Sequence, residues 1–245
     1  MIPAHKNPFL DWCCYQYVHR LVRKSFHNVS IRGLDRLRNL DADKPVIVIS
    51  NHTNWWDALA VFILTRAAPH KSFYCMMEEK QLRAYRFFAW LGAFSVDPDN
   101  PLRAAASVRY AIRLLQQKET LMWIFPQGQM VSPHQPIKVR EGANYLAAQA
   151  HSAVMLPVAF RYEFFRDDKP LMLVDIGQPF PAHDSSDERV GATCNQVAQN
   201  LDQVVRTQDL TGFEPFLKPR LSINKKWQWV CLAAKGRLKE FDPAN

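Results

Sequence analysis

Residues 45–57 read PVIVISNHTNWWD, an apolar run followed by a polar and aromatic turn. The run is typical of a strand that is buried on both faces of a sheet. His52 and Asp57 follow it, and on one straight helix residues with this spacing would lie about 140° apart. They can face each other only if His52 lies in the turn and Asp57 in the first turns of the next helix. The stretch therefore places a potential base and its orienting carboxylate at the carboxyl end of a strand, where open α/β sheets usually keep their sites.

Apolar runs of the same kind recur along the chain, with helical segments between them. The runs predict strands at 45–50, 72–76, 92–96, 120–125, 153–160 and 171–177, and the periodicity predicts helices near 9–26, 55–67, 82–91, 101–117, 141–150 and 187–208. Strands that alternate with helices indicate an α/β fold. We expect a single domain with a mixed, largely parallel sheet flanked by helices.

The chain divides into three parts. Residues 1–28 form an N-terminal amphipathic helix that associates with a membrane, 29–210 form the α/β domain, and 211–245 form a basic segment packed on the domain or on the membrane. A broad face of the first helix is apolar and has basic residues beside it. The residues that can share this face are Phe9, Trp12, Cys13, Tyr17, Leu21 and Phe26.

The composition favours an anionic partner. The 245 residues are 48% hydrophobic, enough for one substantial core, and the formal net charge is +8. This charge suits nucleic acid, a phospholipid surface or a phosphate-bearing substrate. The five cysteines form no C-x-x-C pair, which argues against a zinc site or a disulfide framework and favours a reducing cytoplasm. No stretch of about 18 residues lacks charge, so we expect no membrane-spanning helix.

The C-terminal segment mixes basic residues with Trp227 and Trp229. The basic residues are Lys218, Arg220, Lys225, Lys226, Lys235, Arg237 and Lys239. One interpretation is a helix packed on the domain with solvated lysines, and the other is an interfacial segment with tryptophans at headgroup depth. No nucleic-acid readout motif accompanies the charges. We therefore expect an anionic membrane surface and no nucleic acid as partner, and a peripheral or monotopic protein at the cytoplasmic face of a membrane.

Three further stretches combine an apolar strand with a turn or a break. They are GAFSVDP (92–98), WIFPQGQM (123–130) and MLPVAFRY (155–162). The second breaks at Pro126 and Gly128, and a glycine lets the backbone N–H approach a ligand closely, although a plain strand-ending turn explains it as well. In the third, Pro157 removes a ladder hydrogen bond and predicts an edge, a bulge or a wall beside a site. Taken alone, His52 is more often an ordinary hydrogen-bonded histidine.

Together and in this order, the four stretches resemble the blocks of the glycerolipid acyltransferase superfamily, which includes glycerol-3-phosphate and lysophosphatidate acyltransferases. Asn51, His52 and Asp57 match its first block, N-H-x-x-x-x-D, in full. The other matches are Gly92 and Asp97 in the second block, Phe125, Pro126 and Gly128 in the third, Arg140, Glu141, Gly142 and Ala143 in a downstream Lys-Gly-Ala segment, and Leu156, Pro157 and Val158 in the fourth. The resemblance covers about residues 30–178, and four ordered blocks are more specific than any one.

The resemblance implies an O-acyltransferase that moves a fatty acyl group from an acyl thioester, carried by coenzyme A or acyl carrier protein, to a lipid hydroxyl. His52 would take the proton of the hydroxyl, and Asp57 would hold the imidazole tautomer. Gly128 N–H would contact the oxyanion or a phosphate. Neither a metal, a cofactor nor a covalent enzyme intermediate is implied. The residues expected to face the acyl chain or the membrane are Trp55, Trp56 and Pro157, with core packing equally open for the tryptophans.

The same blocks supply the expected acceptor- or substrate-binding residues. These are Asn51, Asp97, Arg103, Phe125, Pro126, Gln127, Gln129, Lys138 and Arg140. The chain departs from the family pattern where Pro98 replaces an Arg and where Gln127, Gln129 and Met130 replace Glu, Thr and Arg.

In the family, the second-block Arg and the third-block Glu and Arg help to bind the acceptor's phosphate, and a guanidinium makes a bidentate contact that glutamine or methionine cannot make. Either Arg103, Lys138 or Arg140 substitutes, or the acceptor carries no phosphate there. Lysophosphatidate, another lipid alcohol, a glycolipid or pigment hydroxyl, and an amine stay open as acceptors. A non-catalytic lipid-binding protein and a thioester hydrolase are the alternatives to a transferase.

Overall fold

The computed structural model describes residues 1–165, 168–184, 186–217 and 223–237. Its strands are β1 (Asn28–Arg32), β2 (Val46–Ser50), β3 (Ser72–Glu78), β4 (Ala93–Val96), β5 (Thr120–Ile124), β6 (Val154–Glu163), β7 (Leu171–Ile176), β8 (Phe180–Pro181) and β9 (Glu214–Pro215). Its α-helices are α1 (Pro8–Ser25), α2 (Leu34–Arg38), α3 (Trp56–Leu64), α4 (Glu79–Ala84), α5 (Phe87–Trp90), α6 (Pro101–Leu114), α7 (Glu141–Gln149), α8 (Asp187–Thr207) and α9 (Ile223–Ala234).

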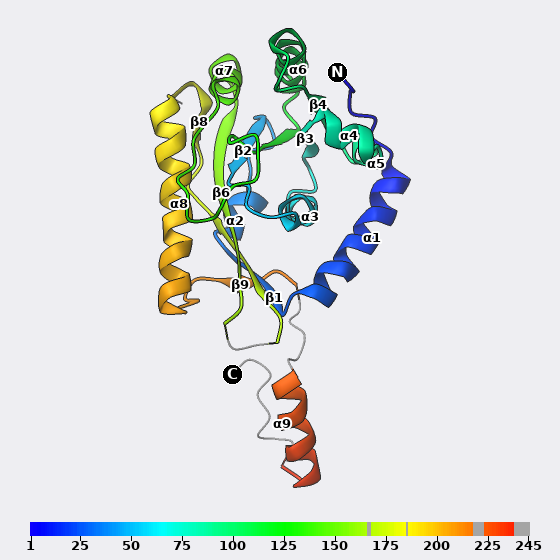
Figure 1. Ribbon diagram of the computed structural model, residues 1–245, viewed down its shortest axis with the longest axis vertical. Coiled ribbons are helices and arrows are strands. Elements are labelled where there is room, and N and C mark those ends of the chain that lie inside the picture. Colours follow the sequence, from blue (N-terminus) through cyan, green and yellow to red (C-terminus); the bar gives the residue numbers. More distant parts are fainter. Residues whose placement is uncertain (166–167, 185, 218–222, 238–245) are drawn as a thin grey trace.

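The strands form one mixed sheet in the order β4-β3-β5-β2-β6-β7-β1-β9, with β8 paired to β6 (Figure 1). The five strands from β4 to β6 are parallel to one another. β7 runs antiparallel to β6, β1 runs parallel to β7, and β9 runs antiparallel to β1. The predicted fold class, a mixed and largely parallel α/β sheet flanked by helices, is confirmed.

The register of β2 aligns the ends of the strands that surround it. Val48 pairs with Trp123 of β5 and with Leu156 of β6, and Trp123 pairs in turn with Cys75 of β3. The carboxyl ends of these parallel strands therefore lie at one edge of the sheet. The loops that follow β2, β4 and β5 emerge at this edge, because β4 is parallel to β3, and the polar residues singled out in the sequence lie on or just after these loops.

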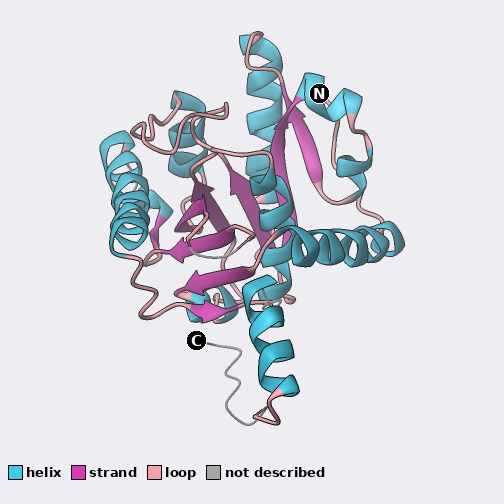
Figure 2. Cartoon of the chain, turned by 60° about the horizontal axis from the view of Figure 1, so that its bottom comes forward, coloured by secondary structure: helices cyan, strands magenta, loops and turns pink. Residues whose placement is uncertain are grey.

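Both faces of β2 are buried, which explains its unbroken apolar run. Val46 and Val48 pack with residues of α1, α2 and α3, whereas Ile47 and Ile49 pack with residues of α6, α7 and α8. Figure 2 shows the strands in the middle of the molecule with helices around them. Burying each such side chain contributes about 1.5–3 kcal/mol. β2 is thus a fixed support for the turn that follows it.

The observed elements differ from the predicted ones by the division of one helix and by four short elements that were not predicted, which are α2, β1, β8 and β9. The predicted helix over 82–91 is instead two short helices, α4 and α5, because residues 85–86 form a turn between them. The sequence of β1, NVSIR, contains only Val29 and Ile31 as strongly apolar residues. β1 owes its position to β7, with which it pairs over all five of its residues.

α1 is the helix expected near the N-terminus, and its apolar residues lie on two sides. Asn7 caps the helix, because its Oδ1 accepts a hydrogen bond from the N–H of Phe9 at 3.1 Å. Val18 and Val22 are buried against the domain, whereas Phe9 and Trp12 are 70% and 59% exposed. One side of α1 therefore packs on the domain and the other presents aromatic side chains to the surroundings.

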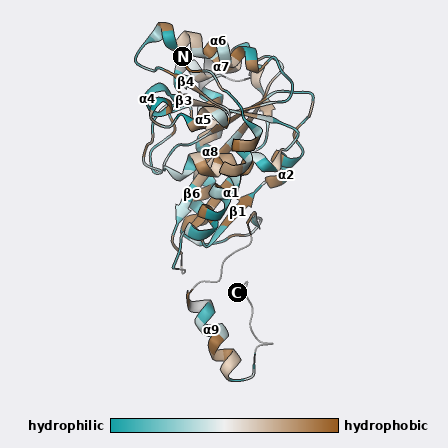
Figure 3. Ribbon diagram, turned by 90° about the vertical axis from the view of Figure 1, so that its right-hand side faces the viewer, coloured by the Kyte–Doolittle hydropathy of each residue, from teal (hydrophilic) through white to brown (hydrophobic). Residues whose placement is uncertain are grey.

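α9 lies beyond β9 and away from the sheet in Figure 1, and Figure 3 shows hydrophobic residues on it. Trp227 and Trp229 of α9 are exposed. Three residues of the predicted basic segment, Lys218, Arg220 and Lys239, fall outside the described residues. Within the described ranges, no helix combines the length and the apolar character needed to cross a membrane.

Candidate active site

The turn after β2 is tied to β6 by the side chain of Asn51. Asn51 Nδ2 donates to the Phe160 carbonyl at 2.9 Å, and Asn51 Oδ1 accepts from the Phe160 N–H at 2.7 Å. The side chain thus continues the pairing of the two strands beyond Ser50, which pairs with Val158. Asn51 is buried. Asn51 therefore has a structural role between β2 and β6, and its expected contact with substrate stays a prediction.

His52 Nδ1 and Asp57 Oδ2 lie 2.8 Å apart. His52 lies in the turn after β2, and Asp57 lies in the first turn of α3, which is the arrangement expected from their spacing. Asp57 is fully buried, whereas the His52 side chain is 21% exposed. An ionised carboxylate only accepts hydrogen bonds, so in a neutral imidazole Nδ1 carries the proton and Nε2 presents the lone pair. The pair therefore has the geometry of a general base and its orienting carboxylate.

Asp57 receives hydrogen bonds on both carboxylate oxygens. Oδ2 also accepts from the N–H groups of Thr53 and Asn54, at 2.7 and 2.9 Å. Oδ1 accepts from the hydroxyl of Tyr162 at 2.6 Å. These donors satisfy the buried charge and fix the carboxylate plane, and the amino end of α3 favours a negative charge there.

Tyr162 is absent from the residues that the sequence analysis names. Val158 of β6 pairs with Ser50, the last residue of β2. β6 continues five residues further, to Glu163, so Tyr162 lies beside the turn that follows β2. Burial raises the pKa of Tyr162 well above its ordinary value, with the negative charge of Asp57 as the second cause. The hydroxyl therefore stays protonated and donates. The alternation of side chains along β6 is the sequence feature that indicates Tyr162, because it puts Val158, Phe160 and Tyr162 on one face.

The loop after β5 holds His52 from two sides. The ring of His52 stacks on the ring of Phe125, with centroids 4.1 Å apart and 20° between the planes. The His52 N–H donates to Gln127 Oε1 at 3.1 Å, and the His52 carbonyl accepts from the Val131 N–H at 2.9 Å. The structure thus brings together Phe125 and Gln127 with the histidine, as the order of blocks suggests.

Gly128 has a left-handed backbone with φ of 68°, a conformation that glycine adopts without strain. A Cβ at this position would lie 2.8 Å from Arg140 Nε. Its N–H donates to the Phe125 carbonyl at 3.0 Å. The sequence analysis expects this N–H to contact an oxyanion or a phosphate. In the structure the turn itself uses this donor, and the glycine is needed for the turn and for Arg140. A contact with an oxyanion or a phosphate stays a prediction.

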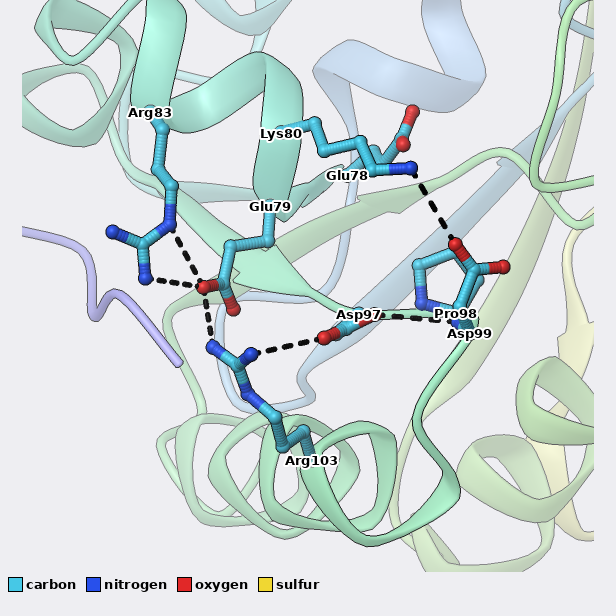
Figure 4. Close-up of a pocket in the computed structure, with 8 residues that line it drawn as sticks. All are labelled: Glu78, Glu79, Lys80, Arg83, Asp97, Pro98, Asp99 and Arg103. Atoms are coloured by element: carbon cyan, nitrogen blue, oxygen red, sulfur yellow. Dashed lines mark hydrogen bonds and ion pairs between the residues drawn. The ribbon is translucent and has the colours of Figure 1, made fainter.

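Arg103 and Asp97 lie together in a charged cleft at the carboxyl ends of β3 and β4 (Figure 4). The cleft has a volume of about 210 Å³ and is lined by Glu78, Glu79, Lys80, Arg83, Asp97, Pro98, Asp99 and Arg103. Arg103 pairs with Asp97 at 3.1 Å and with Glu79, which also pairs with Arg83 at 2.6 Å. The hydrogen bond from Arg83, followed by that from Arg103, lowers the pKa of Glu79. Arg103 is therefore neutralised by its neighbours.

Lys138 and Arg140 are the other two cations expected to substitute for the family's missing arginine. Arg140 contacts the loop after β5, whereas Lys138 is exposed. The Arg140 N–H donates to the Pro126 carbonyl at 2.9 Å, and its Nε donates to the Gln127 carbonyl at 3.1 Å. Pro126 is thus a buried acceptor within the loop, and Gln129 is exposed. Gln127 links Arg140 to His52, because its carbonyl accepts from Arg140 Nε and its Oε1 accepts from the His52 N–H.

Two expectations about the apolar residues are resolved by their surroundings. Trp55 is 60% exposed, and Trp56 packs edge-on against Phe26 at 4.9 Å, so the two tryptophans differ in role. Pro157 is predicted at an edge, a bulge or a wall beside a site, facing the acyl chain or the membrane. The edge position is wrong, because Pro157 is buried inside β6 opposite Ile49 of β2, and the N–H of Gly177, which follows β7, donates to its carbonyl. The contact with an acyl chain stays a prediction.

The arrangement can take a proton from a hydroxyl group at His52 Nε2 and hold the resulting imidazolium beside Asp57. In the described part of the chain, no three His, Cys, Asp or Glu side chains gather as metal ligands would. The fold and the site thus define an α/β protein with a hydrogen-bonded histidine–aspartate pair at the carboxyl edge of its parallel strands.

Comparison with known proteins specifies the class. Residues 28–161, more than half of the chain, match the Acyltransferase family. The chain therefore belongs to the acyltransferase family, within the glycerolipid acyltransferase superfamily that the four blocks indicate.

Two known proteins are similar to this chain. Over 159 residues the chain is 27% identical to a putative 1-acyl-sn-glycerol-3-phosphate acyltransferase, acl-2, of Caenorhabditis elegans; the match covers 63% of this chain and 50% of that protein. The chain thus spans about half the length of that relative. The crystal structure of the 1-acyl-sn-glycerophosphate acyltransferase PlsC from Thermotoga maritima has the same fold, with a TM-score of 0.59 and 17% identity over 78% of this chain and 79% of that chain.

Proposed function

We propose that the protein transfers a fatty acyl group from an acyl thioester to a hydroxyl of a lipid acceptor, with His52 as the general base. The 2.8 Å contact of His52 with the fully buried Asp57 carries this proposal, in a chain that belongs to the acyltransferase family. The name of the Caenorhabditis elegans relative supports a glycerolipid acceptor.

In the proposed reaction the acceptor hydroxyl attacks the thioester carbonyl carbon while His52 Nε2 takes its proton. The carbonyl oxygen becomes an oxyanion in a tetrahedral intermediate. When this collapses, the carbon–sulfur bond breaks, and the departing thiolate takes the proton from His52. Asp57 stabilises the transient imidazolium, and Tyr162 and the turn amides hold Asp57 in place. General-base catalysis of this kind contributes about 10²–10⁴-fold. No covalent enzyme intermediate is required, and the carrier of the thioester is coenzyme A or acyl carrier protein.

Charge pairing in the cleft favours an acceptor without a phosphate monoester. Arg83 and Arg103 pair with Glu79, and Lys80 pairs with Asp99 at 3.6 Å. A phosphate monoester brings about 1.5–2 negative charges at pH 7. Binding it in the cleft would break these ion pairs or add uncompensated negative charge. Of the cations on the loop after β5, Arg140 is bonded to the Gln127 carbonyl and Lys138 is exposed, so a lipid alcohol with a neutral head fits this site better than lysophosphatidate.

The charged cleft is within reach of a head group whose hydroxyl lies at His52. In the register of the sheet, Val48 is level with Trp123 and Cys75, so His52 is level with the end of β3. β3 is two strands from β2, a lateral distance of roughly 10 Å.

A thiol-release assay tests the proposed function. The protein is incubated with palmitoyl-coenzyme A, with or without a detergent-solubilised acceptor, and free thiol is followed. We expect release that depends on the acceptor and is lost, by at least roughly 10²-fold, in a folded His52→Ala variant. Release without an acceptor would instead identify a hydrolase. No release with either palmitoyl-coenzyme A or palmitoyl-acyl carrier protein, or a near-native rate in His52→Ala, would contradict the proposal.

The same assay ranks the acceptors. Lysophosphatidate, monoacylglycerol, a monoglycosylated long-chain alcohol and a long-chain amine are compared at equal chain length. We expect the neutral hydroxyl acceptors to have the higher kcat/KM. A clear preference for lysophosphatidate that disappears in Arg140→Gln would show that Arg140 binds the phosphate, and it would overturn the charge argument while leaving the transferase assignment intact.

We also propose that the protein attaches peripherally to a membrane. The acceptor and the product are lipids, and α1 presents exposed Phe9 and Trp12 while Trp55 is exposed in the turn that carries His52. Aromatic side chains of this kind lie favourably at the interface of a bilayer. A surface-bound domain could draw a lipid acceptor directly from the bilayer into the site.

A further inference from the structure

Phe26 follows directly after α1, and the backbone on either side of its ring is held in place. Its own N–H donates to the Val22 carbonyl in the last turn of α1 at 2.9 Å. The N–H of the next residue, His27, donates to the carbonyl of Pro170, just before β7, at 2.9 Å. The Phe26 side chain is buried, with only 3% exposed. The end of α1 is therefore a fixed point from which an aromatic ring enters the core.

The ring of Phe26 contacts two aromatic side chains that border Asp57. It meets Trp56 edge-on, with centroids 4.9 Å apart and 81° between the planes, and it lies 5.8 Å from the ring of Tyr162. Aromatic rings attract each other at such distances. Trp56 precedes Asp57 in the chain, and the Tyr162 hydroxyl donates to Asp57 Oδ1 at 2.6 Å. One phenyl ring thus contacts both the start of α3 and the tyrosine donor from β6.

α1 also holds α3 beyond its other end. Arg66 follows α3 in the chain and pairs with Asp11 of α1 at 2.6 Å, and its guanidinium lies over the ring of Tyr15 at 4.8 Å. The end of α1 therefore contacts the start of α3, and the start of α1 contacts the segment after α3. These contacts fix the position of α3, which carries Asp57, relative to α1.

We propose that Phe26 is a positioning residue for the acyl-transfer step, which it serves by holding the Tyr162 ring so that the hydroxyl stays bonded to Asp57. This rests on the proposed function. A hydrogen bond weakens steeply with its angle, so a small tilt of the tyrosine ring loosens Asp57 and, with it, the imidazole of His52. Misplacing a catalytic group slightly lowers the rate strongly. α1, whose other side presents exposed aromatic residues, thus also supports the base.

The first measurement compares Phe26→Leu with Phe180→Leu in the thiol-release assay, using the best acceptor of the panel. Both substitutions remove a buried ring and keep an apolar side chain. Phe180 is the matched control, because it is 7% exposed and packs in the cluster on the other face of the sheet. We expect Phe26→Leu to lower kcat by roughly 10-fold, the loss expected when a charged acceptor loses a donor, with both KM values unchanged.

Phe180→Leu should keep kcat within about 3-fold of the wild type, because its ring lies on the face of the sheet opposite to Asp57. A loss below about 3-fold in Phe26→Leu, or a change confined to KM, overturns the proposal. An equal loss of kcat in both variants overturns it as well, since any loosening of the core would then lower the rate.

A double variant shows whether Phe26 acts through Tyr162. Tyr162→Phe removes the hydroxyl, so a residue that positions only this hydroxyl has nothing left to position. We expect Phe26→Leu to lower the kcat of Tyr162→Phe by less than about 3-fold, whereas independent effects would multiply. Losses that multiply would show that Phe26 supports the domain without acting through the tyrosine, and they would overturn the proposal.

A second substitution keeps the proposal testable if Phe26→Leu does not fold, as judged by circular dichroism. Phe26→Met lacks the ring and has a flexible side chain that fills irregular gaps in a core. Its kcat should fall by the same factor with KM unchanged, and a kcat within about 3-fold of the wild type overturns the positioning role. An inactive wild-type protein would instead refute the proposed function, so the two failures are distinguishable.

Discussion

At the scale of single residues, the site depends on how completely Asp57 is satisfied. Its two oxygens accept from His52, from the Thr53 and Asn54 amides, and from the Tyr162 hydroxyl. The backbone donors come from the turn itself and survive most substitutions. The tyrosine comes from β6 and is the one donor that a single mutation removes cleanly.

Tyr162→Phe should lower kcat by roughly 10-fold while the protein stays folded. The ring contact with Phe26, at 5.8 Å, is kept, but a hydrogen bond to a charged group is lost, which is worth about 1.5–3 kcal/mol. Because burial raises the pKa of Tyr162 well above 10, the wild-type rate should show no decline from ionisation of this hydroxyl up to pH 10. Steady-state rates from pH 6 to 10 check both points. An unchanged kcat in Tyr162→Phe would contradict this role of the tyrosine and show that the turn amides alone are enough to position Asp57.

At the scale of elements, the sequence predicts those parts of the site whose residues lie close together in the chain. The buried strand, the turn with His52 and the start of α3 fall within fifteen residues, and their local pattern determines them. The contact of Gln127 with His52 and that of Tyr162 with Asp57 join residues 75 and 105 positions apart. Only the order and register of the strands bring these together.

Pro157 shows how a sound local rule can fail at the same scale. A proline removes a ladder hydrogen bond, yet Pro157 lies between two strands in the middle of the sheet. Its carbonyl accepts from the Gly177 N–H at 2.8 Å, and its ring lies where a side chain on Gly177 would clash. Packing among distant elements, which no local pattern encodes, accommodates the proline.

Glu79 links three elements, and its removal should destabilise the fold in a pH-dependent way. Glu79 begins α4 and pairs with Arg83 of α4, Arg103 of α6 and, at 3.8 Å, the amino group of Met1. Hydrogen bonds from Arg83 and then Arg103 lower its pKa. A lowered pKa means that the ionised group stabilises the fold above its ordinary value of about 4.3 and stops doing so as the pH falls through the folded-state value.

Glu79→Gln should therefore lower the urea midpoint at pH 7, and the difference from the wild type should shrink towards pH 3. Glu119→Gln is the control, because Glu119 is an exposed glutamate just before β5. Urea unfolding at pH 7, 5 and 3 measures the effect. A midpoint difference that is equal at all three pH values would show that the ion pairs contribute nothing beyond packing.

At the scale of the whole molecule, the segment that leads into α1 lies against α5, and both helices carry exposed aromatic side chains. The Asn7 N–H donates to the Trp90 carbonyl at 2.9 Å, and the His5 N–H donates to the Ala89 carbonyl at 2.8 Å. Phe9 and Trp12 follow within the first turns of α1, and Trp90 is 43% exposed. We call Phe9, Trp12, Phe87 and Trp90 the aromatic patch. α4 begins in the charged cleft and α5 follows it, so the aromatic patch flanks the charged cleft.

Combined with a net charge of +8, the aromatic patch predicts two components of membrane binding. Aromatic burial at the interface is insensitive to salt, whereas each basic residue near an anionic surface contributes about 1 kcal/mol that salt screens over about 8–10 Å. Exposed Lys226 and Lys235 of the C-terminal segment add to the second component.

Vesicle co-sedimentation should resolve these components. The wild type should bind vesicles of phosphatidylglycerol and phosphatidylcholine better than vesicles of phosphatidylcholine alone, and raising the salt should weaken binding without abolishing it. Phe9→Ser with Trp12→Ser should lower the salt-resistant part by roughly 10–100-fold, because two aromatic side chains no longer leave water. The control is Tyr145→Ser, which removes an aromatic side chain that is 56% exposed on α7, a helix whose Leu146 and Ala147 pack on the other face of the sheet. Equal losses in the double variant and in the control, or no binding to either vesicle, would contradict attachment through the aromatic patch and leave the positive charge as ordinary surface solvation.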